Sequence, residues 1–322
     1  MKNKKLPVLI ILCLLCVLIA INLIKNRNST LSSHDAQLTL RDSTVVHHML
    51  VRRTNDSLYI SRQTNETWIF TDKRIANPAY LKFCFRIFSQ LKISSVVPKN
   101  QWNSIRDSIV HNGVEIVLYD QHHQVVQDIF LFSDRQNQKT YALRKSGKQP
   151  FLVELPGYEG NFSGIFYLPI THWYQPLIIH YHPAQIREVH VEHTESPSKS
   201  FTLRKLPGQL PVLLDIENEP HPYSEEAVKA YLTFLRNISV DRYLDKPSLY
   251  DSLQHAHPIY RILIVDQSDS LNQLSFYPIR QQNRVDKNFC YVTVPNGLVG
   301  IIPYYRLDPV ARPIDFFTSF GE

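Results

Sequence analysis

The sequence predicts an α+β fold that is built twice, as two duplicated units behind one N-terminal transmembrane helix. Two similar helical patterns recur at a constant offset along the chain, and several short apolar strands follow each of them. Runs of strands interrupted by one helical stretch are typical of antiparallel α+β sheets, not of a doubly wound parallel sheet. A long uncharged segment near the N-terminus predicts the membrane helix.

The two main helices are predicted from matching apolar stripes. The segments that begin at Ala76 and Tyr223 both place apolar residues at positions i, i+3, i+7 and i+10, as a helix with one buried face does. The stripe residues are Leu81, Cys84, Phe88 and Leu91 in the first segment, and Val228, Tyr231, Leu235 and Ile238 in the second. Asn77 and Ser224 stand where N-cap residues are expected, and Pro78 suits the first helical position.

The similarity continues into the strands that follow. Residues 114–121 (VEIVLYDQ) resemble residues 260–267 (YRILIVDQ), and both run mostly apolar before they end in Asp-Gln. A short second helix is expected in each copy, from Gln101 until Gly113 ends it and again from Pro247. We therefore expect each unit to hold an antiparallel sheet, one main amphipathic helix and a short second helix.

Residues 7–24 form the predicted transmembrane signal anchor. They contain no charged residue over nearly the length that crosses a hydrocarbon core, and the sequence MKNKK before them favours a cytoplasmic N-terminus. Residues 1–6 are then a cytoplasmic basic tail and residues 25–43 a polar linker. The first unit follows at 44–182 and the second at 184–322. This layout predicts a single-pass protein of the inner membrane with its soluble part in the periplasm.

A cleaved signal peptide and a lipoprotein signal are the alternatives to an anchor. Signal cleavage needs small residues before the cut, and no A-x-A-like site follows Ala20. A lipoprotein cysteine would need a small residue before it, but leucine precedes both Cys13 and Cys16. The uncleaved anchor is therefore favoured, although each alternative would also export the rest of the chain.

The composition excludes two classes of protein. The net charge of +6 is concentrated in lysines and arginines that flank the apolar segment, so the folded part is close to neutral and no nucleic-acid partner is expected. Only Cys84 and Cys290 lie outside the apolar segment, which excludes a framework of several disulfides. We expect both cysteines to be packed thiols.

Motifs for catalysis or nucleotide binding are absent from the sequence. There is no G-x-S-x-G nucleophile motif, and the glycine-containing stretch PGYEGNFSG lacks the lysine of a P-loop. Two pairs of adjacent histidines, His47-His48 and His122-His123, are weak ligand candidates, because neighbouring residues on a strand point to opposite faces. We therefore expect a non-enzymatic protein with no cofactor.

A binding surface is predicted at the junction of the two units, from Trp173, Tyr174, His180, His182 and His190. His180 and His182 lie two residues apart on an expected strand and would share one face, which is compatible with a surface metal site. The simpler interpretation is a solvated polar face, so no metal is expected. The two aromatic residues could line a groove or could pack between the units.

The stretch that begins PGYEGNFSGIFYLP carries a resemblance to a known family. It continues through Trp173 to an I-x-x-V-x-V strand and an S-F-x-L strand. Together with the tandem units, this order resembles domain-of-unknown-function family 4340 over nearly all of the soluble chain. The resemblance implies an exported, membrane-anchored bacterial protein, related to the periplasmic part of auxiliary components of gliding-motility-type ABC transporters. The family tends to place Arg-Asp after the tryptophan, whereas Tyr174 and Gln175 stand here, and it supplies no catalytic residues.

The expected function is that of a non-enzymatic, membrane-anchored extracytoplasmic protein. It would act as a binding or scaffold component of a cell-envelope assembly, such as a transport or motility accessory, with a protein partner in the envelope. The alternative is a ligand- or metal-binding sensor ectodomain that uses the histidines. A hydrolase is the third hypothesis.

Overall fold

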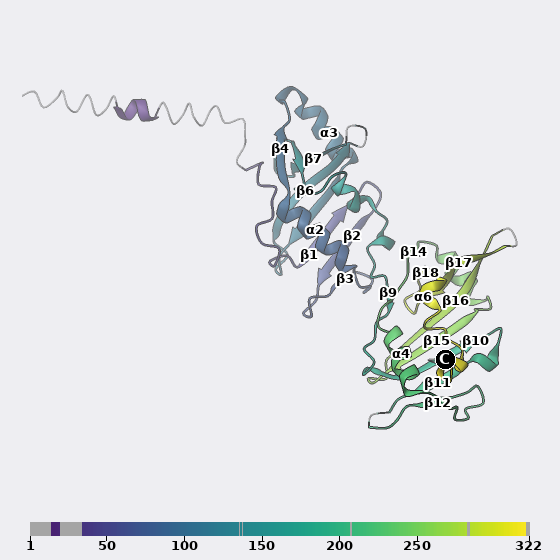
Figure 1. Cartoon of the computed structure of the whole chain (residues 1–322). Coiled ribbons are helices and arrows are strands. Elements are labelled where there is room, and N and C mark those ends of the chain that lie inside the picture. Colours follow the sequence, from purple (N-terminus) through teal and green to yellow (C-terminus); the bar gives the residue numbers. More distant parts are fainter. Residues whose placement is uncertain are drawn as a thin grey trace, which may run out of the picture. The chain divides into compact units, whose positions relative to one another are not determined.

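The computed structural model describes residues 14–19, 34–134, 136, 138–206, 208–281 and 284–319 (Figure 1). The described residues form two compact units. The first combines those of Met1–Thr71 with Ala79–Leu168, and the second combines Asp72–Pro78 with those of Pro169–Glu322. Both units contain large antiparallel sheets with few helices, so the predicted α+β class is confirmed.

The boundary between the units differs from the one expected after residue 182. Strand β9 (Leu177–Ile179) pairs with β13 (Ile238–Ser239), and this pairing ties residues that follow Leu168 to the second unit. The backbone N–H of Asn77 also donates to the carbonyl of Trp173 at 2.7 Å. These two main-chain contacts place the boundary at a different point from the predicted one. The periodicity of a single segment does not reveal such contacts.

The first unit is an eight-stranded antiparallel sheet in the order β3-β2-β1-β5-β6-β7-β8-β4. Its strands are β1 (His48–Arg52), β2 (Ser57–Arg62), β3 (Trp68–Phe70), β4 (Lys92–Val96), β5 (Val114–Tyr119), β6 (Val125–Asp134), β7 (Lys139–Arg144) and β8 (Phe151–Glu154). Its helices are α2 (Pro78–Gln90) and α3 (Trp102–Asn112), with 3₁₀ turns at Lys99–Gln101 and Phe162–Tyr167.

The second unit has an eight-stranded sheet in the order β12-β11-β10-β15-β16-β17-β18-β14. Its strands are β10 (Ile186–His193), β11 (Phe201–Arg204), β12 (Val212–Leu214), β14 (Arg242–Leu244), β15 (Tyr260–Asp266), β16 (Leu271–Gln281), β17 (Arg284–Thr293) and β18 (Val299–Pro303). Its helices are α4 (Glu225–Phe234), α5 (Pro247–Gln254) and α6 (Tyr304–Leu307), with 3₁₀ turns at Ile170–His172, Pro197–Lys199 and Ile314–Phe317. When the strands of each large sheet are numbered in chain order within that sheet, both sheets have the same spatial order.

The predicted apolar stripes are buried in both units, because all eight of their residues are at most 7% exposed. Helix α4 is shorter than its stripe suggested. It ends at Phe234, so Leu235 and Ile238 pack beyond its last turn. The hydroxyl of Ser224 accepts a hydrogen bond from the Ala227 N–H at 3.4 Å, as expected of an N-cap residue.

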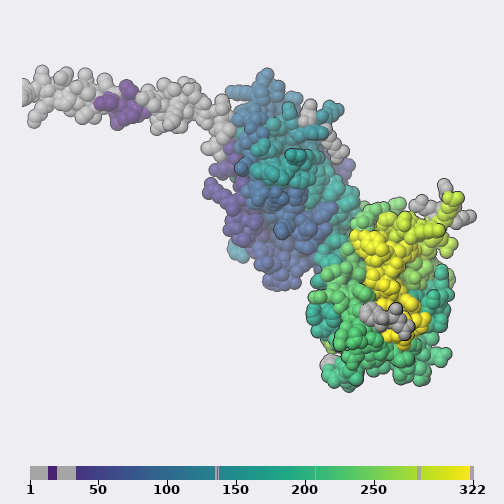
Figure 2. All heavy atoms as spheres, in the orientation of Figure 1, coloured from purple at the N-terminus to yellow at the C-terminus, as the bar shows by residue number. Residues whose placement is uncertain are grey.

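Helices cover both faces of the second sheet. Tyr231 of α4 packs edge-on against Phe201 of β11, whose face of the sheet also carries Leu274. Leu253 of α5 packs with Tyr277 of β16, which points to the opposite face because it lies three positions after Leu274 on the same strand. Figure 2 shows the end of the chain, in yellow, lying over the surface of this unit.

Two cross-strand ion pairs occupy matching positions with their charges exchanged. In the first unit Arg52 of β1 lies directly opposite Glu115 of β5 and donates to its carboxylate. In the second unit Glu192 of β10 lies directly opposite Arg261 of β15, with 3.0 Å between Nη1 and Oε2. Two residues of opposite charge at paired positions stabilise a strand pair, and the effect does not depend on which strand carries the cation.

The structure describes only part of the N-terminal region for which the anchor and the linker were predicted. Of the predicted membrane segment 7–24, residues 14–19 are helical and the remainder lies outside the described residues. No helix within the described ranges is long and apolar enough to cross a membrane. The linker expected at 25–43 is wrong from residue 34 onward, because Leu38 and Leu40 are buried against the first unit.

Candidate functional site

The two aromatic residues of the predicted binding surface are part of a core. Trp173 is fully buried and Tyr174 is 5% exposed, so neither offers a surface to a partner. The Tyr174 hydroxyl accepts a hydrogen bond from Arg74 at 3.0 Å and donates to Asp72 at 3.3 Å. Burial raises the pKa of Tyr174, so its hydroxyl keeps its proton. Packing and hydrogen bonding within the second unit account for both residues.

His180 and His182 lie beside one groove of about 530 Å³, together with Tyr181, Phe234 and Arg236. Strand β9 ends at Ile179, so the two histidines follow the strand and do not share a strand face as predicted. His180 Nδ1 lies 2.8 Å from the carbonyl oxygen of Arg236, beyond the end of α4. His182 Nδ1 accepts a hydrogen bond from the Ala184 N–H at 3.3 Å. Both rings therefore already bond within the chain.

His190 does not join that groove. It lies on β10, where Glu192, two residues further on, shares its face of the second sheet, and its Nδ1 is 2.9 Å from the Thr202 hydroxyl. Within the described part of the chain, no group of three or more His, Cys, Asp or Glu residues is placed to hold a metal ion. The predicted site residues thus separate into a core, a groove and a sheet face.

The two adjacent histidine pairs meet through one member of each. The rings of His48 and His123 stack with 4.1 Å between their centroids, and the Tyr59 ring lies 5.8 Å from that of His48. The pairing of β1 with β5 produces this contact, because His48 lies opposite Tyr119, close to the turn that holds His123. Sequence reasoning considered each histidine pair alone and missed the contact between them.

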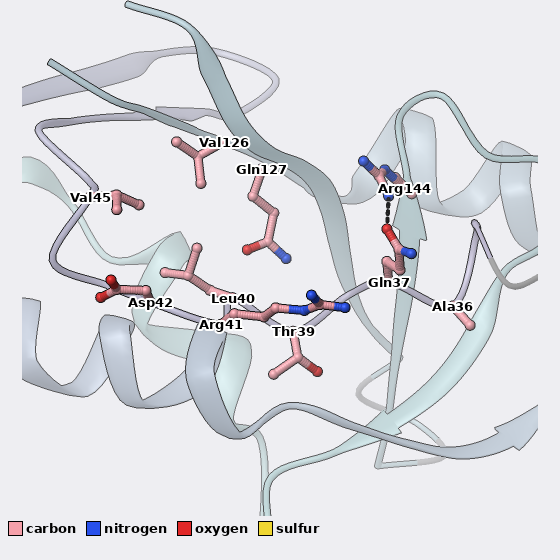
Figure 3. Close-up of a pocket in the computed structure, with 10 residues that line it drawn as sticks. All are labelled: Ala36, Gln37, Thr39, Leu40, Arg41, Asp42, Val45, Val126, Gln127 and Arg144. Carbon is pink, nitrogen blue, oxygen red and sulfur yellow. Dashed lines mark hydrogen bonds between the residues drawn. The ribbon is translucent and has the colours of Figure 1, made fainter. Parts of the chain in front are cut away.

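A pocket of about 460 Å³ lies in the first unit, where residues 36–45 pass over β6 and β7 (Figure 3). Three hydrogen bonds hold this segment in place. The carbonyl of Leu38 accepts from Gln127, the N–H of Leu40 donates to the Phe88 carbonyl at 2.8 Å, and the Thr39 hydroxyl donates to the Leu91 carbonyl at 2.9 Å. The pocket wall is therefore fixed to β6 and to the end of α2.

Gln127 lies at the centre of this pocket, and Figure 3 shows its side chain extending between the other lining residues. The residue is only 7% exposed. Its Nε2 donates to Leu38, whereas its Oε1 has no hydrogen-bond partner among the described residues. A buried polar atom of this kind is costly to leave unsatisfied, so it marks a position where a ligand donor would bind favourably.

Charged residues stand at both ends of the pocket. In Figure 3 the guanidinium group of Arg41 extends toward the end where Arg144 and Gln37 lie, and Asp42 lies at the other end. Arg144 Nη1 donates to the carbonyl of His34 at 3.2 Å and to Gln37 Oε1 at 3.4 Å. One end therefore presents cationic donors and the other an anionic acceptor.

One feature of the sequence, a glutamine among the buried positions of β6, could have indicated this pocket. In β6 the residues Gln127, Ile129 and Leu131 alternate onto one face, and that face is buried. A glutamine in phase with core residues indicates a polar group that must be satisfied inside the fold. The opposite wall of the pocket lies mostly in residues 36–43, which belong to the predicted linker.

No protein-family description matches the chain, and no curated protein matches it. Function must therefore be argued from the residues themselves.

Proposed function

We propose that this chain is a non-enzymatic, membrane-anchored extracytoplasmic protein that binds a component of the cell envelope. The uncharged segment 7–24 supports the anchor. The common strand order and the exchanged ion pairs support descent of both units from one duplicated module. The further role, as an accessory of a transport or motility assembly, rests only on the order of sequence motifs from Pro156 that resembles family 4340.

The pocket around Gln127 is the proposed binding site, and the unsatisfied Oε1 is the observation that carries this assignment. The pocket volume falls in the range of small-molecule sites, which is about 300–1,000 Å³. The alternative role, a sensor that uses the groove at His180 and His182, has less support, because both rings already bond within the chain.

Cross-linking in intact cells tests this proposal. The full chain, carrying a C-terminal tag, is cross-linked, solubilised and purified, and the same is done for a Gln127→Met/Arg41→Gln variant. We expect one envelope component to recur with the wild type and to fall by about tenfold with the variant, because the pocket loses an acceptor and a cation.

Arg106→Gln is the matched control for this experiment. It removes a positive charge from an exposed position on α3, away from the pocket lining. Recovery of the component should therefore be unchanged. The absence of any recurring component, or equal recovery with the pocket variant, would contradict the proposal.

A further inference from the structure

We propose that the Gln127 pocket binds a sugar acid, a ligand that carries several hydroxyl donors and one carboxylate. This inference rests on the proposed binding function of the pocket and names the class of its ligand. Three features of the lining support it: an acceptor-rich region, a cationic end and an apolar wall.

The orientation of the Gln127 amide is fixed by its neighbour. The carbonyl of Leu38 can only accept a hydrogen bond, so the atom that faces it must be the NH₂ group of Gln127. The remaining atom is the amide oxygen, a pure acceptor, and it is buried without a partner in the described structure. A ligand that satisfies it must bring an O–H or N–H group.

Two further acceptors line the same pocket. The Thr39 hydroxyl donates its hydrogen bond to the Leu91 carbonyl, so it can only accept a hydrogen bond from a ligand. Asp42 Oδ1 accepts from the hydroxyl of Thr44 at 2.7 Å and from its N–H at 2.8 Å. These bonds, that of the hydroxyl foremost, lower the pKa of Asp42, so the carboxylate stays ionised and Asp42 Oδ2 can also accept. Three separate acceptors match a ligand with several hydroxyl groups.

The cationic end selects a carboxylate. Arg41 has no ion-pair partner among the described residues, and Arg144 is oriented by the His34 carbonyl and Gln37. A guanidinium group binds a carboxylate through parallel N–H donors. Because Asp42 lies at the opposite end in Figure 3, it does not stand where the ligand carboxylate would lie.

The remaining lining is apolar, from Leu40, Val45 and Val126. The C–H face of a sugar ring can pack against such a surface while its hydroxyl groups reach the acceptors. A simple carboxylate would leave the acceptors unsatisfied, and a neutral sugar would leave the cationic end unused. A sugar acid satisfies both at once.

Calorimetric titration of the full chain in detergent tests this inference. The probes are sodium D-glucuronate, D-glucose, acetate and L-alanine, each measured at the same ionic strength because exposed charges are screened by salt. We expect glucuronate to bind at least about tenfold more tightly than each of the other three. Gln127→Met and Arg41→Gln should each weaken glucuronate binding by about tenfold, and Arg106→Gln should leave it unchanged.

The outcomes separate the inference from the function on which it rests. Glucuronate binding no tighter than D-glucose, acetate or L-alanine, or unaffected by both pocket substitutions, would overturn the sugar-acid assignment. If the pocket variant still abolishes cross-linking in cells, the binding function stands and only the ligand class is wrong. Arg41 is exposed, so its substitution keeps the test valid if Gln127→Met does not fold.

Discussion

At the residue scale, each unit holds one histidine whose surroundings oppose its charged form. Burial lowers the pKa of His48, and the neighbouring His123 and His47 lower it further, while Asp120 acts in the opposite direction. Burial also lowers the pKa of His193, although its Nε2 donates to the Arg312 carbonyl at 3.1 Å. Both rings are therefore favoured as neutral imidazoles in the folded chain.

These histidines predict a loss of stability in mild acid. Unfolded histidines take up protons near pH 6.5, while the folded rings do so only at lower pH. The unfolded state then binds more protons, so stability falls as the pH drops below about 6.5, by up to ~1.4 kcal/mol per pH unit for each histidine. The midpoint of urea unfolding, measured at pH 7.5 and pH 5.5, reports this loss.

Substitutions identify the source of this acid sensitivity. His48→Gln and His193→Gln should each make the urea midpoint less dependent on pH, whereas His257→Gln, at an exposed position, should not change that dependence. A pH dependence that stays the same in the His48 and His193 variants would show that other groups cause it.

At the element scale, the exchanged ion pairs differ in burial, and this difference predicts unequal costs of charge reversal. The Glu115 side chain is 7% exposed and binds both Arg52 and Lys145, whereas the Glu192 and Arg261 side chains are 36% and 45% exposed. Glu115→Arg should lower the free energy of unfolding by about 2–4 kcal/mol, because it buries a cation beside two others. Arg261→Glu should cost below about 1 kcal/mol.

The compensating substitution checks the reason for this cost. Adding Arg52→Glu to Glu115→Arg recreates the arrangement of the second unit and should restore about half of the lost stability in urea unfolding. Equal costs for the two single reversals, or no recovery in the double variant, would refute the account of matched pairs.

The elements that the sequence predicted well are those with local signals. The helices and the β5 and β15 strands follow from periodicity, and both Asp-Gln pairs form the same turn. Asp120 Oδ1 accepts from the N–H groups of His122 and Gln124, and Asp266 Oδ1 does the same for Ser268 and Ser270. An Asp that bonds the backbone two residues on is a local turn device, so sequence alone can reveal it.

The candidate site could not be predicted because it depends on distant contacts. Its wall joins the sheet through the bond between Gln127 and Leu38, which are far apart in sequence. Trp173 and Tyr174 were assigned to a surface because an aromatic pair has the same composition in a groove and in a core. Only the pairing of β9 and the packing around it decide between those two environments.

At the scale of the whole molecule, the proposed protein would combine a membrane anchor, a duplicated module and a ligand pocket. The pocket wall at residues 36–45 follows soon after the predicted membrane segment in the sequence. A binding protein of the envelope requires that both units be exported, because the ligand and its partners would lie outside the cytoplasm.

Reporter fusions in a bacterial host test this central claim most directly. Alkaline phosphatase, which is active only outside the cytoplasm, is fused to the C-terminus of the full chain and of a chain that lacks residues 1–33. The account predicts phosphatase activity in the membrane fraction for the full chain and none for the shortened chain. An inactive full-length fusion, together with a fluorescent full-length fusion to a cytoplasm-specific reporter, would contradict it.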